Sequence, residues 1–175
     1  MNDAVKVFAI EPIDETFKEL LKNIDLNNYT RQIVPVPVAL SFAIGEGKMI
    51  GNDGRAGSSG AQLMFDSNAP GLSIRTMTGD QILGQIADPS AIVKIDTDGN
   101  EFDVLRGLEQ SFEAGLIESV LVETTSANVL QIDNFLESHN LLEDISYLEI
   151  EGHSNHRRIK AGNEERTKIY SQLKS

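Results

Sequence analysis

The chain of 175 residues contains no cysteine. Disulfide bonds, thiolate metal sites and cysteine nucleophiles are therefore excluded. Basic residues are also scarce, since 15 Lys and Arg residues stand against 27 Asp and Glu residues and the net charge is −12. Nucleic acids and anionic membrane surfaces attract proteins through a basic footprint, so we expect neither as a partner.

Long apolar runs are absent as well, and no segment reaches the length needed to span a membrane. The first residues lack the basic segment and apolar core of a secretory signal, so we expect a cytoplasmic protein. The length and the ordinary apolar and charged fractions fit one domain over residues 1–175. The polar tail from about His153 is left without a predicted structure.

Residues 92–107 are the most distinctive segment of the sequence. It opens with a short apolar run rich in β-branched residues, which predicts a strand buried on both faces. Asp96, Asp98 and Glu101 follow directly, and the spacing after them is helical. Open parallel sheets bind their ligands at the carboxyl ends of the strands, so we expect functional side chains here.

Apolar residues alternate along the chain between strand-like and helix-like spacing. The pattern predicts helices from the N-cap Asp14 to Asn27–Asn28 and over 80–86, 101–112 and 129–138, and strands over 5–10, 33–40, 72–76, 92–95, 119–123 and 147–150. Residues 45–61, rich in Gly, Ser and Asn, are predicted to form an irregular loop. Alternating strands and helices favour an α/β fold with a mostly parallel sheet.

The acidic cluster has several interpretations. An EF-hand is excluded, because placing Asp98-Gly99 at the fifth and sixth loop positions puts Leu105 where the bidentate Glu belongs. A helix N-terminal cap with first-turn acids accounts for Asp98 or Glu101, but poorly for three acids together. Clustered carboxylates repel one another, so we expect raised pKa values or a nearby cation. The spacing does not specify a divalent metal.

The segment 94–107 closely resembles the signature K-I-D-x-[ED]-G-x-E-x-x-V-L-x-G of the FkbM-type methyltransferases. Glu11-Pro12 and the apolar stripe of the helix after it are similar to the second-strand region of that family. The glycine- and serine-bearing segment 52–59 is similar to a family loop that tends to lie over the acceptor site. The resemblance implies an S-adenosylmethionine-dependent enzyme that methylates a hydroxyl oxygen of a carbohydrate or small-molecule acceptor.

The resemblance also implies a Rossmann-like methyltransferase sheet with helices on both faces. It implies that Glu11 binds the ribose hydroxyls of S-adenosylmethionine, and that Pro12, Ala39 and Leu40 also contact this cofactor. The alternative for Glu11 is a solvated acid that favours the N-terminus of a helix.

Asp96 is expected to line the junction between cofactor and acceptor, while Asp98 or Glu101 positions or deprotonates the acceptor hydroxyl. Glu123, at the end of the next predicted strand, is expected to face the same crevice, with a surface acid as the alternative. A base is needed because a neutral alcohol is a weak nucleophile. His153 and His156 are further candidates, although histidines in a polar tail are more often solvated.

One part of the family pattern is missing. A complete methyltransferase begins with a strand and a glycine-rich loop near the methionine part of the cofactor, and nothing of this kind precedes Lys6. This unit, of about 30 residues, normally fills the sheet centre between the Glu11 strand and the Asp96 strand. We expect a truncated chain, a partner chain that supplies the unit, or a domain that no longer catalyses.

Two functions of other classes compete with methyl transfer. A non-catalytic nucleoside-binding or scaffold module would keep the fold and lack turnover. A nicotinamide-dependent oxidoreductase would also use Glu11 for a ribose. The acidic block and the absence of an internal Tyr-x-x-x-Lys pair weigh against the oxidoreductase.

Overall fold

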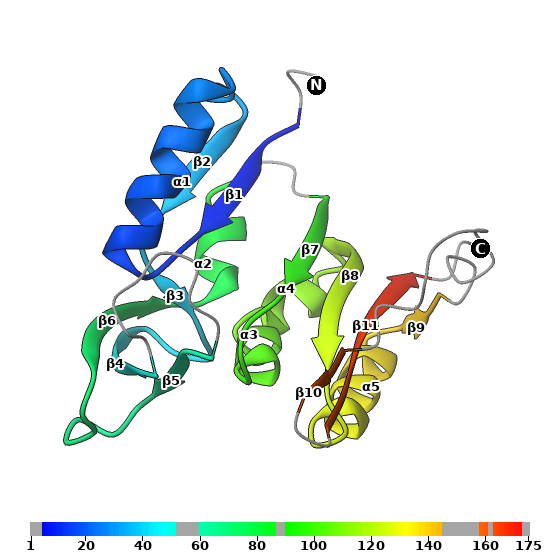
Figure 1. The fold of residues 1–175 in the computed structure, drawn as a ribbon. Coiled ribbons are helices and arrows are strands. Elements are labelled where there is room, and N and C mark those ends of the chain that lie inside the picture. The colour runs from blue at the N-terminus through cyan, green and yellow to red at the C-terminus, as the bar shows by residue number, and fades with distance from the viewer. Residues whose placement is uncertain (1–4, 52–59, 87–89, 145–157, 161–162, 173–175) are drawn as a thin grey trace. The chain divides into compact units, whose positions relative to one another are not determined.

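A computed structural model describes residues 5–51, 60–86, 90–144, 158–160 and 163–172 (Figure 1). The chain divides into two compact units, Met1–Thr78 and Gly79–Ser175, and each contains its own sheets. None of the helices in these described ranges is both long enough and apolar enough to cross a membrane.

Unit 1 combines a parallel strand pair with a small mixed sheet. In chain order, its described elements are β1 (Val7–Ile10), α1 (Asp14–Leu26), β2 (Ile33–Val36), β3 (Ala39–Leu40), β4 (Gly45–Ile50), β5 (Gln62–Met64) and β6 (Leu72–Met77). α1 connects the parallel strands β1 and β2. The second sheet has the order β3-β6-β4-β5, in which β3 and β6 are parallel and β4 is antiparallel to both of its neighbours.

The helix and the last strand of unit 1 agree with the prediction to within a residue or two. α1 ends at Leu26, and Asn28 takes a positive φ of 58° just beyond it. Its N-cap is Ile13, so the predicted cap at Asp14 is wrong by one position. Asp14 still lies in the first turn, where a negative charge favours the helix dipole.

Two other predictions for unit 1 are wrong. Residues 33–40 form two strands in different sheets, because Pro37 has no N–H for a ladder and Val38 N–H instead donates to the carbonyl of Val36 at 3.0 Å. The predicted loop 45–61 begins with the strand β4. Gly47 is a packing requirement there, since a Cβ would lie 2.6 Å from Cδ1 of Leu63. Residues 52–59 lie outside the described part of the chain.

The described part of unit 2 contains one five-stranded sheet and four helices. In chain order, its described elements are α2 (Gly79–Leu83), β7 (Ala91–Ile95), α3 (Glu101–Arg106), α4 (Glu109–Glu113), β8 (Ile117–Thr124), α5 (Val129–Ser138), β9 (Leu141–Glu143), β10 (Arg158–Lys160) and β11 (Asn163–Gln172). The sheet order is β10-β11-β8-β7, and β9 pairs with β11. β7 and β8 are parallel, whereas every pairing of β11 is antiparallel.

The protein is therefore α/β as predicted, but its sheets are mixed rather than mostly parallel. β11 was not expected, because the tail is too polar to stand out as a strand. The predicted strand at 147–150 lies outside the described residues. α5 and β8, in contrast, confirm the predicted helix over 129–138 and the predicted strand over 119–123.

β7 is an edge strand in the described part of unit 2, where β8 alone pairs with it. Ile92 is 77% exposed and Lys94 is also exposed, whereas Ile95 is buried, so one face of the strand is open to solvent. The prediction that this strand is buried on both faces is therefore wrong.

The predicted helix over 101–112 is divided into α3 and α4. Asp80 causes the division, since its carboxylate accepts hydrogen bonds from the backbone N–H groups of Gln110 (3.2 Å) and Ser111 (2.9 Å) at the start of α4. Its own N–H donates to the carbonyl of Gly107 at 2.9 Å. Asp80 therefore starts a new helix where the periodicity alone predicts continuation.

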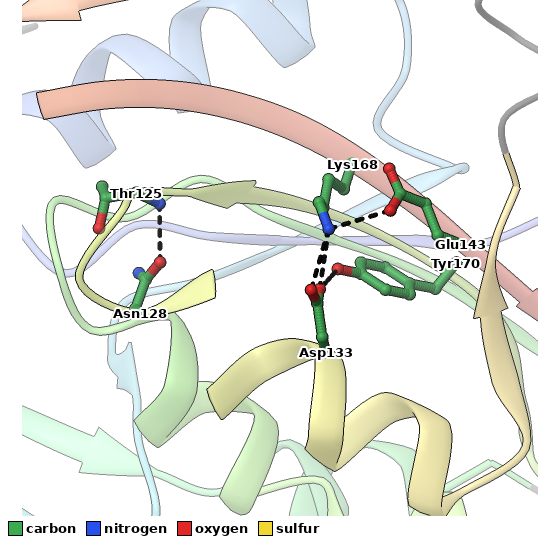
Figure 2. Close-up of polar contacts among 6 residues, drawn as sticks. All are labelled: Thr125, Asn128, Asp133, Glu143, Lys168 and Tyr170. Atoms are coloured by element: carbon green, nitrogen blue, oxygen red, sulfur yellow. Dashed lines mark hydrogen bonds and ion pairs between the residues drawn. The ribbon is translucent and has the colours of Figure 1, made fainter. Parts of the chain in front are cut away.

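α5 is tied to the sheet by a polar cluster of four residues, which Figure 2 shows. Asp133 of α5 accepts hydrogen bonds from Nζ of Lys168, at 2.9 and 3.1 Å, and from the hydroxyl of Tyr170. Lys168 also forms an ion pair with Oε2 of Glu143 at 3.0 Å. The helices α3, α4 and α5 contact one another through Phe135, which lies against Phe102 and Phe112.

Candidate active site

The carboxyl ends of β7 and β8 bring two of the predicted acids close together. These parallel strands are neighbours, with Ile95 opposite Val122, so the next residues along them are Asp96 and Glu123. Neighbouring strands lie about 4.8 Å apart, so the two acids occupy adjacent positions at one sheet edge. Parallel strands of this kind present ligand sites at that edge.

Asp96 and its neighbours differ in how far they are exposed. The Asp96 side chain is 56% exposed, and its Oδ2 lies 2.6 Å from Nζ of Lys94. Lys94 is therefore the cation that the acidic cluster leads us to expect. Asp98 and Glu123 are half-buried. The cluster thus combines an exposed, cation-paired carboxylate with two more sheltered ones.

Glu101 is the buried member of the cluster, with only 2% of its surface exposed. Its Oε1 accepts hydrogen bonds from the Thr97 hydroxyl and the Gly99 backbone N–H, both at 3.0 Å. Its Oε2 accepts one from the side-chain amide of Asn128, also at 3.0 Å. Both carboxylate oxygens are therefore occupied by groups of the chain itself.

Asn128 contacts the acidic cluster, a contact that the sequence did not predict. It occupies the N-cap of α5 and contacts Glu101 from the loop after β8. Its Oδ1 accepts a hydrogen bond from the backbone N–H of Thr125 at 2.7 Å, as Figure 2 shows. An Asn just before an apolar helix stripe signals a cap, and nothing in the sequence signals a partner 27 residues earlier.

Glu11 lies in unit 1, directly after β1. Its Oε1 accepts a hydrogen bond from the backbone N–H of Ile13 at 2.8 Å, and its side chain is half-buried. Burial raises the pKa of Glu11 above its ordinary value, and the hydrogen bond from Ile13 opposes this shift. Glu11 is therefore a sheltered carboxylate whose charge the fold satisfies in part.

The other predicted cofactor residues also lie in unit 1. Pro12 is half-buried beside Glu11. The Ala39 side chain belongs to the core of the small sheet with Met49, Leu63 and Ile74. Leu40 ends β3, and the fully buried Ser41 after it has a hydroxyl for which no hydrogen-bond partner is found among the described residues.

Some predicted features fall outside the described residues, namely His153, His156 and the segment 52–59. Within the described ranges, no group of three or more His, Asp or Glu side chains is placed to hold a metal ion.

Comparison with known proteins yields a match to a family model. The model of the methyltransferase FkbM domain matches residues 1–143. Among curated proteins, hexuronic acid methyltransferase AglP of Haloferax volcanii is 29% identical over 119 residues. The match covers 67% of this chain and 46% of that protein, so the chain spans less than half of the relative's length.

Among solved structures, the methyltransferase FkbM from Methylobacillus flagellatus KT is similar in fold. The TM-score is 0.58 with 15% sequence identity, over 95% of this chain and 36% of the other. At this identity the likeness concerns the fold alone.

Proposed function

Because the chain belongs to the FkbM methyltransferase family, we propose that the protein containing it transfers a methyl group from S-adenosylmethionine to a carbohydrate hydroxyl. The observation that carries this proposal is the pair Asp96 and Glu123 at the adjacent ends of parallel strands, inside the family match. The relative that acts on a hexuronic acid supports a sugar as the acceptor.

The residues of unit 1 fit the proposed cofactor. S-adenosylmethionine supplies, when bound, a methyl group on a sulfonium sulfur that an oxygen nucleophile displaces in line. Glu11 offers a half-buried carboxylate to which two ribose hydroxyls can donate hydrogen bonds.

The acidic residues of unit 2 are assigned different roles in the reaction. We infer that Asp98 accepts the proton of the acceptor hydroxyl, while the hydroxyl oxygen attacks the methyl carbon and the carbon–sulfur bond breaks. Glu101 is less suited to this role, because both of its oxygens already accept hydrogen bonds. Asp96 and Glu123 orient the acceptor hydroxyl groups.

A methyl-transfer assay with the full-length protein tests the proposed function. The donor is S-adenosylmethionine with a labelled methyl group. The acceptor is p-nitrophenyl β-D-glucuronide, a hexuronic acid whose anomeric hydroxyl is blocked by the p-nitrophenyl group. We expect label in the glucuronide as a methyl ether. Consumption of the donor without a methylated sugar, or no consumption, would contradict the proposal.

The affinity for the cofactor is expected to fall as the pH is lowered through the pKa of Glu11. That pKa is raised by burial, and only the ionised carboxylate accepts both ribose hydrogen bonds. Below the pKa, the dissociation constant should rise by about tenfold per pH unit. Calorimetry of the full-length protein with S-adenosylhomocysteine measures this change. Glu11→Gln should bind weakly with no such pH dependence, and a flat wild-type profile would contradict the assignment.

We also propose that polypeptide outside residues 1–175, from the same protein or from a partner chain, adds a parallel strand to β7. The support is the edge position of β7 among the described strands, because an edge strand presents backbone N–H and C=O groups that another strand can pair with. The alternative, a non-catalytic nucleoside-binding or scaffold module, has no need of such a strand.

Residues 1–175 alone are therefore expected to bind S-adenosylmethionine weakly or not at all. Calorimetric titration of this fragment beside the full-length protein measures the difference. In hydrogen exchange, the amides of β7 should be slower in the full-length protein than in the fragment. Micromolar affinity of the fragment would refute this prediction.

A further inference from the structure

We propose that Asn128 and Glu101 are positioning residues, and that the hydrogen bond between them holds the loop after β7 in place against the loop after β8. This inference rests on the proposed function, because it gives the two loops a task in methyl transfer. It assigns a role to Asn128, which lies outside the acidic signature, and it changes the expected role of Glu101.

The first observation is that Asn128 does not use its side chain as an N-cap normally does. An N-cap Asn usually accepts a hydrogen bond from the backbone of the first helical turn. Asn128 makes no such bond to α5. Its Oδ1 instead accepts from Thr125 N–H, upstream of the helix, and its Nδ2 donates to Glu101. Both the oxygen and the nitrogen of the side-chain amide therefore bind residues outside α5.

The second observation is the burial of Glu101 among uncharged donors. A carboxylate that is 2% exposed depends on its hydrogen bonds, because an unsatisfied buried polar atom is unfavourable. Two of its donors, Thr97 and Gly99, belong to the loop after β7. The third, Asn128, belongs to the loop after β8. One carboxylate therefore orders the first loop internally and links it to the second.

The linked loops are the ones that carry the proposed chemistry. Asp98 lies between Thr97 and Gly99, whose side chain and backbone respectively bind Glu101. Glu123 lies two residues before Thr125, whose N–H binds Asn128. A displacement of reacting groups by about 1 Å can lower turnover by about 100-fold. Loss of the link is therefore expected to affect turnover more than binding of the methyl donor.

A polarity swap tests the link. In Glu101→Gln, the introduced NH₂ group faces the NH₂ group of Asn128, so two donors oppose each other. Rotating the Asn128 amide by 180° would relieve this clash, but Asn128 would then lose the hydrogen bond that it accepts from Thr125 N–H. In Asn128→Asp, the introduced carboxylate faces the carboxylate of Glu101. The double variant Glu101→Gln/Asn128→Asp restores one donor and one acceptor across the link, and it keeps the acceptor for Thr125.

The measurement is kcat and KM of the full-length variants with labelled S-adenosylmethionine and p-nitrophenyl β-D-glucuronide. Each single variant should lose about 100-fold in kcat, with KM for the methyl donor nearly unchanged. The double variant should recover to within about tenfold of wild type, a non-additivity that reports the direct contact. Asn134→Asp, which makes the same chemical change as Asn128→Asp at an exposed position of α5, is the matched control and should keep its kcat.

Three results would overturn the inference. A double variant as inactive as Glu101→Gln would show that the charge of Glu101, rather than its link, is required. Variants that keep the wild-type kcat and lose only stability would show that the link serves folding alone. A wild-type protein that methylates no glucuronide would overturn the proposed function itself, and this failure is recognised without any variant.

Discussion

Replacing Asp133 by Ala is expected to lower the free energy of unfolding of unit 2 by about 3 kcal/mol. The substitution leaves the Lys168 ammonium and the Tyr170 hydroxyl without the carboxylate that they share. The Lys168 side chain is only 12% exposed, so water compensates poorly. Breaking a buried ion pair typically costs about 3–5 kcal/mol. We expect the lower value, because the Asp133 side chain is 26% exposed.

Hydrogen exchange of the β8 and β11 amides in denaturant measures this loss for unit 2 alone. Glu143→Gln is the matched control, because it weakens one ion pair of Lys168 and leaves the pair with Asp133. It should cost less than about 1 kcal/mol. An Asp133→Ala protein as stable as the Glu143→Gln control would contradict the assigned role of the cluster.

The same cluster predicts a loss of stability at alkaline pH. Burial and the Asp133 carboxylate raise the pKa of Tyr170 above its ordinary value. The unfolded chain therefore releases this proton first, and stability falls as the pH rises above about 10. Tyr170→Phe should remove this part of the pH dependence. The comparison of the two unfolding profiles between neutral and alkaline pH provides the measurement.

Asp98→Asn is expected to lower kcat of the full-length protein by about 100- to 10,000-fold, the usual contribution of a general base. The amide keeps the size of the side chain and removes its ability to accept a proton. KM for the methyl donor should change little, because binding of the nucleoside is assigned to Glu11.

Asp103→Asn is the matched control for this prediction. It makes the same chemical change five residues later, in α3, where Asp103 lies 3.6 Å from Arg106 on the helix surface. Such surface pairs contribute about 0–1 kcal/mol, so turnover should be nearly that of wild type. Equal kcat values in the Asp98 and Asp103 variants would remove Asp98 from the proton-transfer step.

The sequence predicts best the elements whose signals are local. The stripe of α5 lies on one helix face, and its predicted bounds agree with the structure. The acids at the end of β7 were also placed correctly at the carboxyl edge of a parallel pair. Both inferences need only neighbouring residues and the periodicity of one element.

Features that depend on distant residues were missed. β11 has little apolar signal of its own, and it is a strand because Tyr170 and Lys168 meet Asp133 and because its backbone pairs with β8. The division between α3 and α4 depends on Asp80, which precedes Ser111 by 31 positions. The hydrogen bond that the Asn128 side chain donates likewise depends on Glu101, a distant residue in the sequence. No local pattern contains these partners.

The central claim is that Glu11, at the end of β1, binds the ribose of the methyl donor in the full-length protein. Hydrogen exchange with and without saturating S-adenosylhomocysteine tests this claim most directly, with NAD as the comparison ligand. The account predicts slower exchange in peptides that cover residues 8–13 with S-adenosylhomocysteine, and no such change with NAD. Saturation of the protein with unchanged exchange in this segment, or protection by NAD instead, would contradict the account.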